Sequence, residues 1–264
     1  MSMISIKDLN LSVTTGKVEK HILRDVSFDL EAGKITGVAG ASGSGKTQTG
    51  LAIMGLSPAG AQLSGSIDFD GTELVGMPPK VHNRLRGVQL SMVFQDPASA
   101  FHPMLTIGDQ MTDHYRHHKK ASKKEALERA VHILGRTRVP HPDEAIGKYP
   151  HQFSGGQLQR IAFASAIICD PNVLIADEPT TALDVTVQAG ILRLLRELCD
   201  DLNLAVLLVT HDFGVLSSVA DTIVVMKNGL VVETGDREPV ITAPQHEYTR
   251  SLIESLPGAE VSHQ

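Results

Sequence analysis

Residues 40–47 have the types and spacing of a phosphate-binding loop, because they read Gly-Ala-Ser-Gly-Ser-Gly-Lys-Thr and match the pattern G-x-x-x-x-G-K-[ST]. Glycines permit turns with positive φ, which point successive backbone N–H groups into one concave anion site. Lys46 then places a positive charge on the phosphates, and the Thr47 hydroxyl suits Mg²⁺. The residues expected to contact nucleotide here are Gly40, Ser42, Gly43, Ser44, Gly45, Lys46, Thr47 and Gln48.

The alternative for this segment is a glycine-rich turn that happens to contain a lysine. The flanking sequence disfavours it. Ile35–Ala39 is an apolar run that predicts a buried strand, and Gln48–Leu56 predicts a helix. A strand, a loop and a helix in this order are the setting in which the phosphate-binding pattern is meaningful.

A second apolar run, Val173–Ala176, ends in the adjacent carboxylates Asp177 and Glu178. Beside a triphosphate, Asp177 is suited to complete the Mg²⁺ shell, because hard cations prefer oxygen ligands. Glu178 is then free to activate the attacking water. Alone, such a pair is usually a solvated loop, but a phosphate-binding loop in the same chain strengthens the functional interpretation.

Two further apolar strands also end in polar residues. Val88–Phe94 leads to Gln95, and Leu204–Val209 leads through Thr210 to His211. Nearly continuous Val, Leu and Ile are typical of strands covered on both faces, as in parallel sheets. Since ligands of such sheets bind beyond the carboxyl ends of the strands, these polar residues are predicted to share one site with the phosphate-binding loop.

The composition is that of a soluble globular chain of 264 residues with 42% hydrophobic residues. A net charge of −6 argues against binding nucleic acid through a general positive field. No secretory signal is expected at the N-terminus, and no apolar run approaches the ~18 residues of a membrane span. Cys169 and Cys199 form no C-x-x-C motif and are expected to be buried, reduced thiols.

The predicted fold is α/β: a P-loop NTPase (RecA-like) core with an N-terminal antiparallel β subdomain and an inserted α-helical subdomain. Alternation in Ile4–Leu11, Val26–Leu30 and Gly65–Asp70 indicates half-exposed antiparallel strands. Helices are expected over Ala121–Thr137 and from about Ser154 to Cys169. The expected division is 1–95 with 171–240 for the nucleotide-binding core, 96–170 for the helical subdomain and 241–264 for a tail.

The segment that begins the second of these helices is a candidate for another anion site. It reads Phe153-Ser154-Gly155-Gly156-Gln157, in which Ser154 would cap the helix and the glycines permit close approach to the backbone. From the residues alone, a simple capped helix is the favoured interpretation.

Taken in order, these motifs resemble the ATP-binding cassette (ABC) ATPases over nearly the whole chain. The resemblance adds Ala182-Leu183-Asp184 to them. It implies ATP and Mg²⁺ as cofactors and two nucleotide-binding subunits that meet head to tail, each completing the other's site. The implied roles are Mg²⁺ binding for Thr47, Gln95 and Asp177, the catalytic base for Glu178, γ-phosphate sensing for His211, contact with the opposite ATP for the segment Ser154–Gln157, and signalling between sites for Asp184.

One departure from the family concerns the adenine base. The family usually places an aromatic residue upstream of the phosphate-binding loop, but no Phe, Tyr or Trp precedes Phe28, which is expected in a core strand. An aliphatic residue, Val13 or Ile22, is expected to cover the base instead. Base stacking contributes roughly 1–3 kcal/mol in nucleic-acid complexes, so nucleotide affinity is expected to be relaxed.

A narrower resemblance is to the ATPases of peptide and nickel importers, through residues 93–103 and 244–252. Because the chain ends shortly after Pro257, the nickel or metal-chelate branch is favoured over the di-/oligopeptide branch on length. His114, His117 and His118 are spaced to share one helical face, either as a metal chelate or as an ordinary solvated face. Neighbouring cations favour the solvated face.

The expected protein is therefore a peripheral ATPase on the cytoplasmic face of the inner membrane that powers uptake of nickel or of peptides. Its implied partners are two membrane-spanning permease subunits, a second ABC ATPase that is a homologous chain and, indirectly, a substrate-binding protein. No nucleic acid is expected. The alternatives are a soluble ABC ATPase acting on nucleic acid or the ribosome, and a P-loop kinase or GTPase. The segment Ser154–Gln157 has no role in a kinase or a GTPase.

Overall fold

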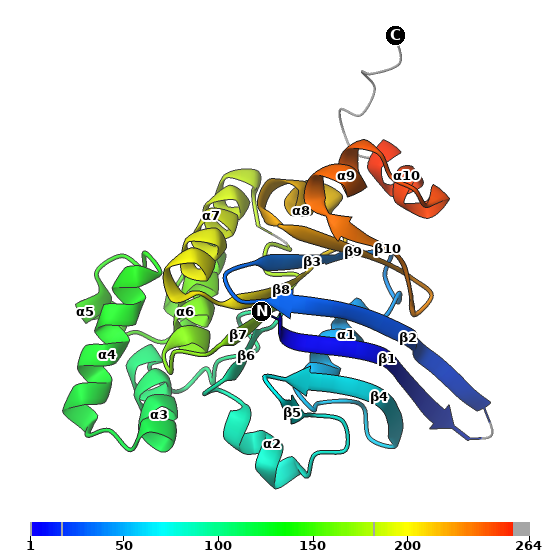
Figure 1. Cartoon of the computed structure of the whole chain (residues 1–264). Coiled ribbons are helices and arrows are strands. Elements are labelled where there is room, and N and C mark those ends of the chain that lie inside the picture. Colours follow the sequence, from blue (N-terminus) through cyan, green and yellow to red (C-terminus); the bar gives the residue numbers. More distant parts are fainter. Residues whose placement is uncertain (1, 17, 182, 256–264) are drawn as a thin grey trace.

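The computed structural model describes residues 2–16, 18–181 and 183–255, so Ala182 and the tail beyond Ser255 lie outside the described residues. A six-stranded sheet forms the centre, with strand order β10-β9-β3-β8-β7-β6. Its strands are β3 (Ile35–Ala39), β6 (Leu90–Val93), β7 (Val173–Asp177), β8 (Ala205–Val209), β9 (Thr222–Lys227) and β10 (Leu230–Asp236). The predicted fold class is confirmed by this arrangement (Figure 1).

Four of the predicted apolar strands lie side by side and parallel, as expected: β3 pairs with β8, β8 with β7 and β7 with β6. Their carboxyl ends therefore meet at one edge of the sheet. The strand predicted over Val88–Phe94 is shorter, because Val88 and Gln89 donate backbone hydrogen bonds to Leu85 in the turn that ends α2 (Pro79–Leu85).

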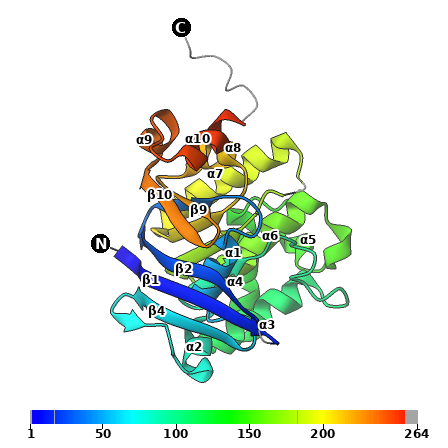
Figure 2. The same cartoon turned by 90° about the vertical axis from the view of Figure 1, so that its right-hand side faces the viewer.

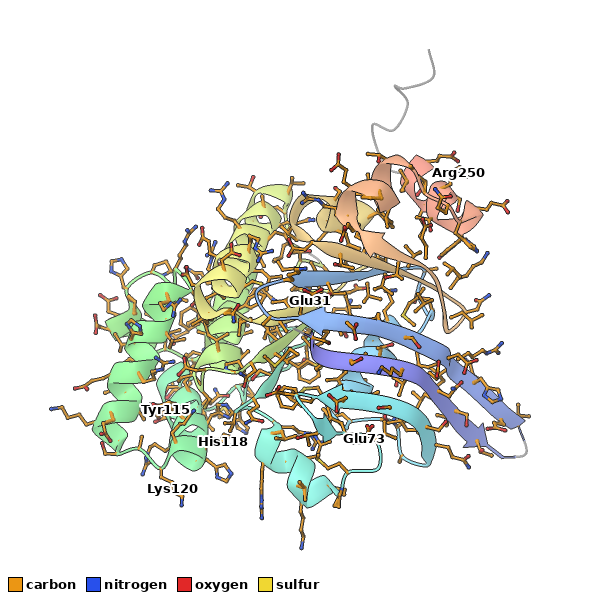
Figure 3. The ribbon with its side chains drawn as sticks, in the orientation of Figure 1. Glu31, Glu73, Tyr115, His118, Lys120 and Arg250 are labelled. Carbon is orange, nitrogen blue, oxygen red and sulfur yellow. The ribbon has the colours of Figure 1, made fainter. Side chains whose placement is uncertain are left out.

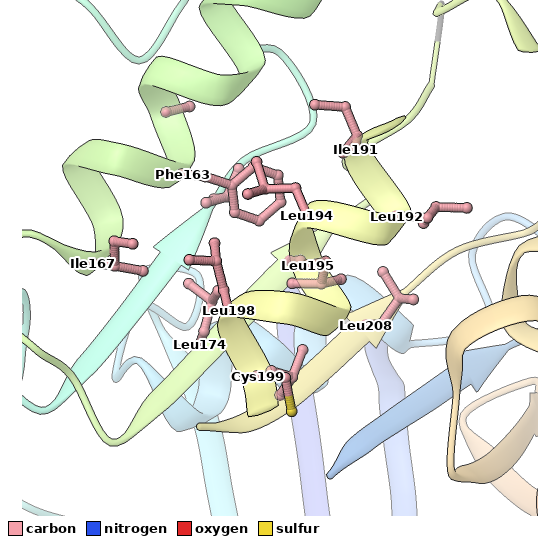
Figure 4. Close-up of a cluster of buried hydrophobic side chains, with 14 of the residues drawn as sticks. Phe163, Ile167, Leu174, Ile191, Leu192, Leu194, Leu195, Leu198, Cys199 and Leu208 are labelled. Carbon is pink, nitrogen blue, oxygen red and sulfur yellow. The ribbon is translucent and has the colours of Figure 1, made fainter. Parts of the chain in front are cut away.

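The central sheet is buried on both faces by two separate hydrophobic clusters. Along β7, Leu174 and Ala176 belong to one cluster, while Val173 and Ile175 belong to the other. The first cluster contains α6 (Gly155–Ile167), α7 (Val185–Leu202) and α8 (Phe213–Val219). Figure 4 shows Phe163 of α6 against the leucines of α7. The near-continuous apolar runs follow from this double coverage.

A second, antiparallel sheet covers the other face together with α1 (Lys46–Ile53), in the order β2-β1-β4-β5 (Figure 2). Its strands are β1 (Ser2–Thr15), β2 (Val18–Glu31), β4 (Ala61–Phe69) and β5 (Thr72–Glu73). The hairpin β1–β2 is longer than the alternation predicted, because pairing continues outward to Thr15 and Val18 after a register shift beyond Leu11. Phe28 is buried in β2, as expected.

Helices fill the chain between β6 and β7: α3 (Ile107–Lys119), α4 (Lys123–Arg136), α5 (Pro142–Ala145), a short 3₁₀ turn over Pro150–Gln152, and α6. Ser122 and Ser154 are the N-caps of the two predicted helices, so α4 begins later than expected and α6 begins directly after its expected cap. Each serine accepts a hydrogen bond from the third helical N–H, and the Glu125 or Gln157 side chain accepts one in return. For α3, the sequence indicates only the spacing of its histidines.

The last part of the chain returns to the central sheet. Helix α7 and strand β8 are followed by α8, and β9 runs parallel to β3 before β10 turns back antiparallel to it. Two short helices, α9 (Arg237–Thr242) and α10 (Glu247–Glu254), then lie beside β9 and β10 at the top of Figure 1. A hydrogen bond between Tyr248 and Ala41 places α10 near the carboxyl end of β3.

Candidate functional site

An open cleft of about 1100 Å³ lies where the carboxyl ends of the parallel strands meet. It is lined on one side by the phosphate-binding loop and on the other by the segment 20–24 of β2. The lining residues are Lys20, His21, Ile22, Arg24, Ser42, Gly43, Gly45, Lys46, Thr47, Gln48, Gln95, Glu178, Thr181, His211 and Asn228. The loop follows β3, and the ends of the other three predicted strands contribute Gln95, Glu178 and His211 to the same cavity.

The phosphate-binding loop is built as the pattern predicts. Gly45 has a φ of 106° and caps the N-terminus of α1, a conformation that side chains rarely adopt. Lys46 is 6% exposed, and its Nζ donates hydrogen bonds to the carbonyls of Gly40 and Ala41 at 2.8 and 3.0 Å. Burial lowers the pKa of Lys46, although the carboxylates of residues 177 and 178 oppose that effect.

Two buried polar atoms of this loop have no hydrogen-bond partner within the described chain, namely Ser44 Oγ and Gln48 Oε1. Buried polar groups are seldom left unpaired, so each indicates a partner from outside the chain. Their place at the start of α1, among inward-facing backbone N–H groups, fits an anion and its counter-cation.

Thr47 and Asp177 meet across the cleft, with the threonine Oγ1 donating to the carboxylate Oδ1 at 3.0 Å. Burial raises the pKa of Asp177, which the hydrogen bond from Thr47 partly offsets. A hydroxyl and a buried carboxylate this close provide hard oxygen donors, so the residues present fit Mg²⁺.

Glu178 is the most heavily contacted side chain of the cleft. Its Oε2 accepts hydrogen bonds from Gln95 Nε2 at 3.1 Å and Thr181 Oγ1 at 2.9 Å, and its Oε1 lies 3.0 Å from His211 Nδ1. Partial burial raises the pKa of Glu178, but the hydrogen bonds from His211 and Thr181 outweigh this and hold the pKa below its usual value. The sequence analysis correctly predicted that Gln95, Glu178 and His211 share one site. It did not identify Thr181, because a threonine after an acidic pair has no distinctive pattern.

The segment Ser154–Gln157 is not part of this cleft. Ser154 and Gly155 are exposed at the N-terminus of α6, and none of the described residues that line the cleft belongs to this segment. A side chain at Gly156 would come within 2.6 Å of Val187 on α7, so the close approach of these two helices requires the glycine.

Asp184 lies beside that segment and caps α7, accepting hydrogen bonds from the N–H groups of Thr186 and Val187 at 3.1 and 3.0 Å. The next residue, Val185, is an apolar side chain that is 83% exposed. Val185 therefore projects into solvent at the start of α7, beside the segment Ser154–Gln157.

The wall of the cleft formed by β2 differs in its details from the expectation for the residues that cover adenine. Ile22 lines the cleft, whereas Val13 is not among its lining residues. Sequence reasoning missed His21, Arg24 and the turn residue Asn228, which also line it. The signal that could have found His21 is a ring upstream of the loop, but histidine is not one of the three aromatic residue types expected there.

Other predicted features lie away from the cleft. His114, His117 and His118 lie on α3, where the His118 ring has its centroid 4.8 Å from that of each of the other two; Figure 3 labels His118. Within residues 2–16, 18–181 and 183–255, no group of three or more His, Cys, Asp or Glu side chains could hold a metal ion. The side chain of His114 is only partly exposed to solvent, because it packs against Gly87.

Both cysteines are buried and unpaired, as expected, and burial raises the pKa of each thiol to about 11. In the part of the chain that the structure describes, none of the helices has the length and apolar character needed to cross a membrane.

Comparison with known proteins agrees with this geometry. The dipeptide transport ATP-binding protein DppD of Bacillus subtilis is 43% identical over 98% of this chain and 78% of that protein. The oligopeptide transport ATP-binding protein OppD of Escherichia coli is 41% identical over 97% of this chain and 76% of its own length. Both relatives are named as peptide transport proteins, and the nickel-specific type expected from the sequence is not confirmed.

Solved structures show the same fold. The dimeric ATP-binding cassette MJ0796 bound to ADP and Pi superposes with a TM-score of 0.79 at 26% identity, over 89% of this chain and 99% of that one. The subunit cbiO1 of the cbiONQ complex of Clostridium perfringens superposes with a TM-score of 0.76 at 27% identity, over 90% of each chain. The family model described as ABC transporter matches residues 23–181, which include the phosphate-binding loop, Gln95, the segment Ser154–Gln157 and the acidic pair. This chain therefore belongs to the ABC transporter family and is an ATP-hydrolysing ATPase of that family.

Proposed function

We propose that this chain forms a composite ATPase with a second ABC ATPase subunit, in which each nucleotide lies between the phosphate-binding loop of one subunit and the segment Ser154–Gln157 of the other. The observation that carries the proposal is the position of this segment, exposed and outside the chain's own cleft. Its capped helix start offers unpaired N–H groups to an anion. The exposed Val185 beside it supports a contact between subunits.

In this assembly, Lys46 and the loop N–H groups bind the phosphates of ATP, and Thr47, Gln95 and Asp177 hold Mg²⁺. The ion, when bound, neutralises charge that develops on the transferred phosphoryl group. Thr47 and Asp177 already meet at 3.0 Å. Gln95 donates to Glu178 through its Nε2 at 3.1 Å, so its carbonyl oxygen is the atom that would ligate the ion.

Glu178 acts as the general base that takes a proton from the attacking water, and His211 contacts the γ-phosphate. Their hydrogen bond at 3.0 Å supports this pairing, because the carboxylate and the imidazole are already adjacent at the mouth of the cleft. Thr181 orients the same carboxylate from the opposite side at 2.9 Å.

The adenine base lies against the β2 wall of the cleft. Ile22 provides an apolar surface, and His21 provides a flat ring of the kind on which bases stack. Arg24, whose backbone N–H donates to Gly229 at 2.8 Å, fixes this wall against the turn that carries Asn228. These contacts replace the aromatic residue that the chain lacks.

The chain powers import of di- or oligopeptides through two permease subunits, peripherally on the cytoplasmic face of the membrane, with a substrate-binding protein acting upstream. The names of its relatives support this substrate class. A mostly apolar groove of about 470 Å³ beside Gln95, lined by residues of β6, α3 and α6, is suited to a short helix of a permease. Phe94 and Phe101 contribute to it, and Phe94 is 43% exposed.

Uptake in cells tests this function. A strain lacking this chain is expected to lose accumulation of a radiolabelled tripeptide, and wild-type chain but not Glu178→Gln should restore it. Nickel uptake, measured in parallel, is expected to stay at the parental level. Loss of nickel uptake with normal peptide uptake would contradict the substrate class, and normal uptake of both would contradict the transport role.

A further inference from the structure

The hydroxyl of Tyr248 contacts the phosphate-binding loop from the far end of the chain. Tyr248 lies in α10, and its Oη accepts a hydrogen bond from the backbone N–H of Ala41 at 2.9 Å, across 207 residues of sequence. The carbonyl of the same Ala41 accepts a hydrogen bond from Lys46 Nζ at 3.0 Å. One residue of the loop is therefore bonded on its N–H side to Tyr248 and on its carbonyl side to the lysine that binds phosphate.

The tyrosine itself is held by the sheet that carries the loop. The ammonium of Lys227, at the end of β9, lies 4.7 Å from the centre of the Tyr248 ring. The backbone N–H of Tyr248 donates to His246 Nδ1 at 3.0 Å, so the start of α10 is capped. Strand β9 pairs in parallel with β3, which leads directly into the loop.

A second anchor ties the start of α10 to β10. The carboxylate of Glu233 accepts backbone hydrogen bonds from Gln245 and His246 at 2.8 and 3.0 Å. Figure 1 shows α10 above β9 and β10, and Figure 3 marks it by Arg250. The Tyr248 hydroxyl is thus fixed relative to the central sheet by contacts on both sides, rather than carried on a free tail.

We propose that Tyr248 is a positioning residue for ATP binding, which holds the first turn of the phosphate-binding loop, and through Ala41 the Lys46 side chain, in the geometry that receives phosphate. This rests on the binding of ATP by the loop. A hydrogen bond of this kind contributes about 0.5–1.5 kcal/mol, so its loss is expected to weaken nucleotide binding about two- to tenfold. The chemical step uses Glu178, and kcat is expected to change less than twofold.

The test compares Tyr248→Phe with wild type. Phenylalanine keeps the aromatic ring beside Lys227 and removes only the hydroxyl that accepts the hydrogen bond from the Ala41 N–H. We expect a two- to tenfold higher KM for ATP, and the same increase in Kd for a fluorescent ATP analogue, with kcat unchanged and the melting temperature lowered by no more than a few degrees. Lys227→Met, which retains the hydroxyl but loses the cation over the ring, is expected to raise KM by a smaller factor.

The matched control is Tyr115→Phe on α3, which removes a tyrosine hydroxyl outside the cleft and is expected to leave KM unchanged. A KM for Tyr248→Phe equal to that of the control would overturn the proposal. So would a melting temperature that falls together with kcat, because that result indicates a purely structural role. Failure of the wild-type chain to bind the analogue would instead contradict ATP binding by the loop itself.

Discussion

Two helix starts in this protein present the same chemistry in opposite directions. Helix α1 follows a glycine cap, Gly45, and α6 begins with Gly155 and Gly156 after the serine cap Ser154, and both helix starts offer unpaired N–H groups. At α1, Lys46 is 6% exposed and faces the chain's own cleft. At α6, Ser154 and Gly155 are exposed and lie outside it. The difference supports the proposal that the chain uses one helix start in its own cleft and supplies the other to the nucleotide of a neighbour.

The largest expected effect comes from removing the carboxylate at the cleft. Glu178→Gln should lower kcat for ATP hydrolysis by about 10²–10⁴-fold, the usual contribution of a positioned general base. Binding of MgATP should persist, because the substitution leaves the contacts of Lys46 and Thr47 intact. Steady-state phosphate release and equilibrium binding of a fluorescent analogue measure the two quantities. Near-normal hydrolysis would show that a residue other than Glu178 is the general base.

A negative charge at the start of α6 is expected to affect ATP hydrolysis by the assembly but not nucleotide binding in the chain's own cleft. Gly155→Asp has room within its own chain, since the nearest atom to an added Cβ is Leu183 Cδ2 at 3.7 Å. A carboxylate facing the partner's nucleotide should oppose its phosphates by several kcal/mol, and about 100-fold lower ATPase activity is expected in the assembled protein. The chain's own affinity for the fluorescent analogue should not change.

The matched control for that variant is Lys123→Asp at the first position of α4. This helix begins with the same reciprocal cap, formed by Ser122 and Glu125, but carries no proposed contact with nucleotide. Activity should stay near wild type. Equal losses from both variants would show that acidic helix starts disturb the helical region in general, and the comparison between α1 and α6 would fail.

A smaller effect is expected at the adenine-side wall of the cleft. His21→Ala should weaken ATP binding about fivefold, near the lower end of the 1–3 kcal/mol that base stacking contributes, because His21 is an exposed ring. Val13→Tyr should leave the affinity unchanged, since Val13 does not line the cleft. Isothermal titration with ATP measures the affinity of both variants. Tighter binding from Val13→Tyr alone would restore the position first expected from the sequence.

The smallest expected effect concerns acid stability. The pKa of Glu178 lies below its ordinary value of 4.5. The ionised carboxylate therefore stabilises the folded state above pH 4.5, and this contribution is lost as the pH falls through the lower, folded-state pKa. Urea midpoints should fall less between pH 7 and pH 3.5 in Glu178→Gln than in wild type. A steeper fall of the urea midpoint in the variant would contradict the downward direction of the Glu178 pKa shift.

The fold was predictable where one residue pattern matched one environment. The runs around Ile35–Ala39 and Val173–Ala176 are apolar because both faces of the sheet are covered, and their polar ends located the cleft. Helix ends were less predictable. Ser154 could be recognised as a cap, but Ser122 was expected inside a helix and instead caps α4, where the side-chain bonds of the capping box decide the helix start.

The parts of the site that the sequence did not reveal are contacts between distant segments. His21 reaches the cleft through a register shift in the hairpin β1–β2, and Tyr248 reaches Ala41 across the whole chain. Neither position has a local pattern, so only the fold brings them to the loop. The choice between nickel and peptide had a different cause: it rested on chain length, which has no physical connection to the substrate.

The burial of both thiols has a practical consequence for spectroscopy. Cys169 and Cys199 are the chain's two cysteines, both are buried, and burial raises the pKa of each to about 11. At neutral pH almost no thiolate is present to react. A single exposed cysteine introduced on α6 or α10 can therefore be coupled selectively to a maleimide dye or spin label in the otherwise native protein. Distances between subunits then become measurable without replacing either natural cysteine.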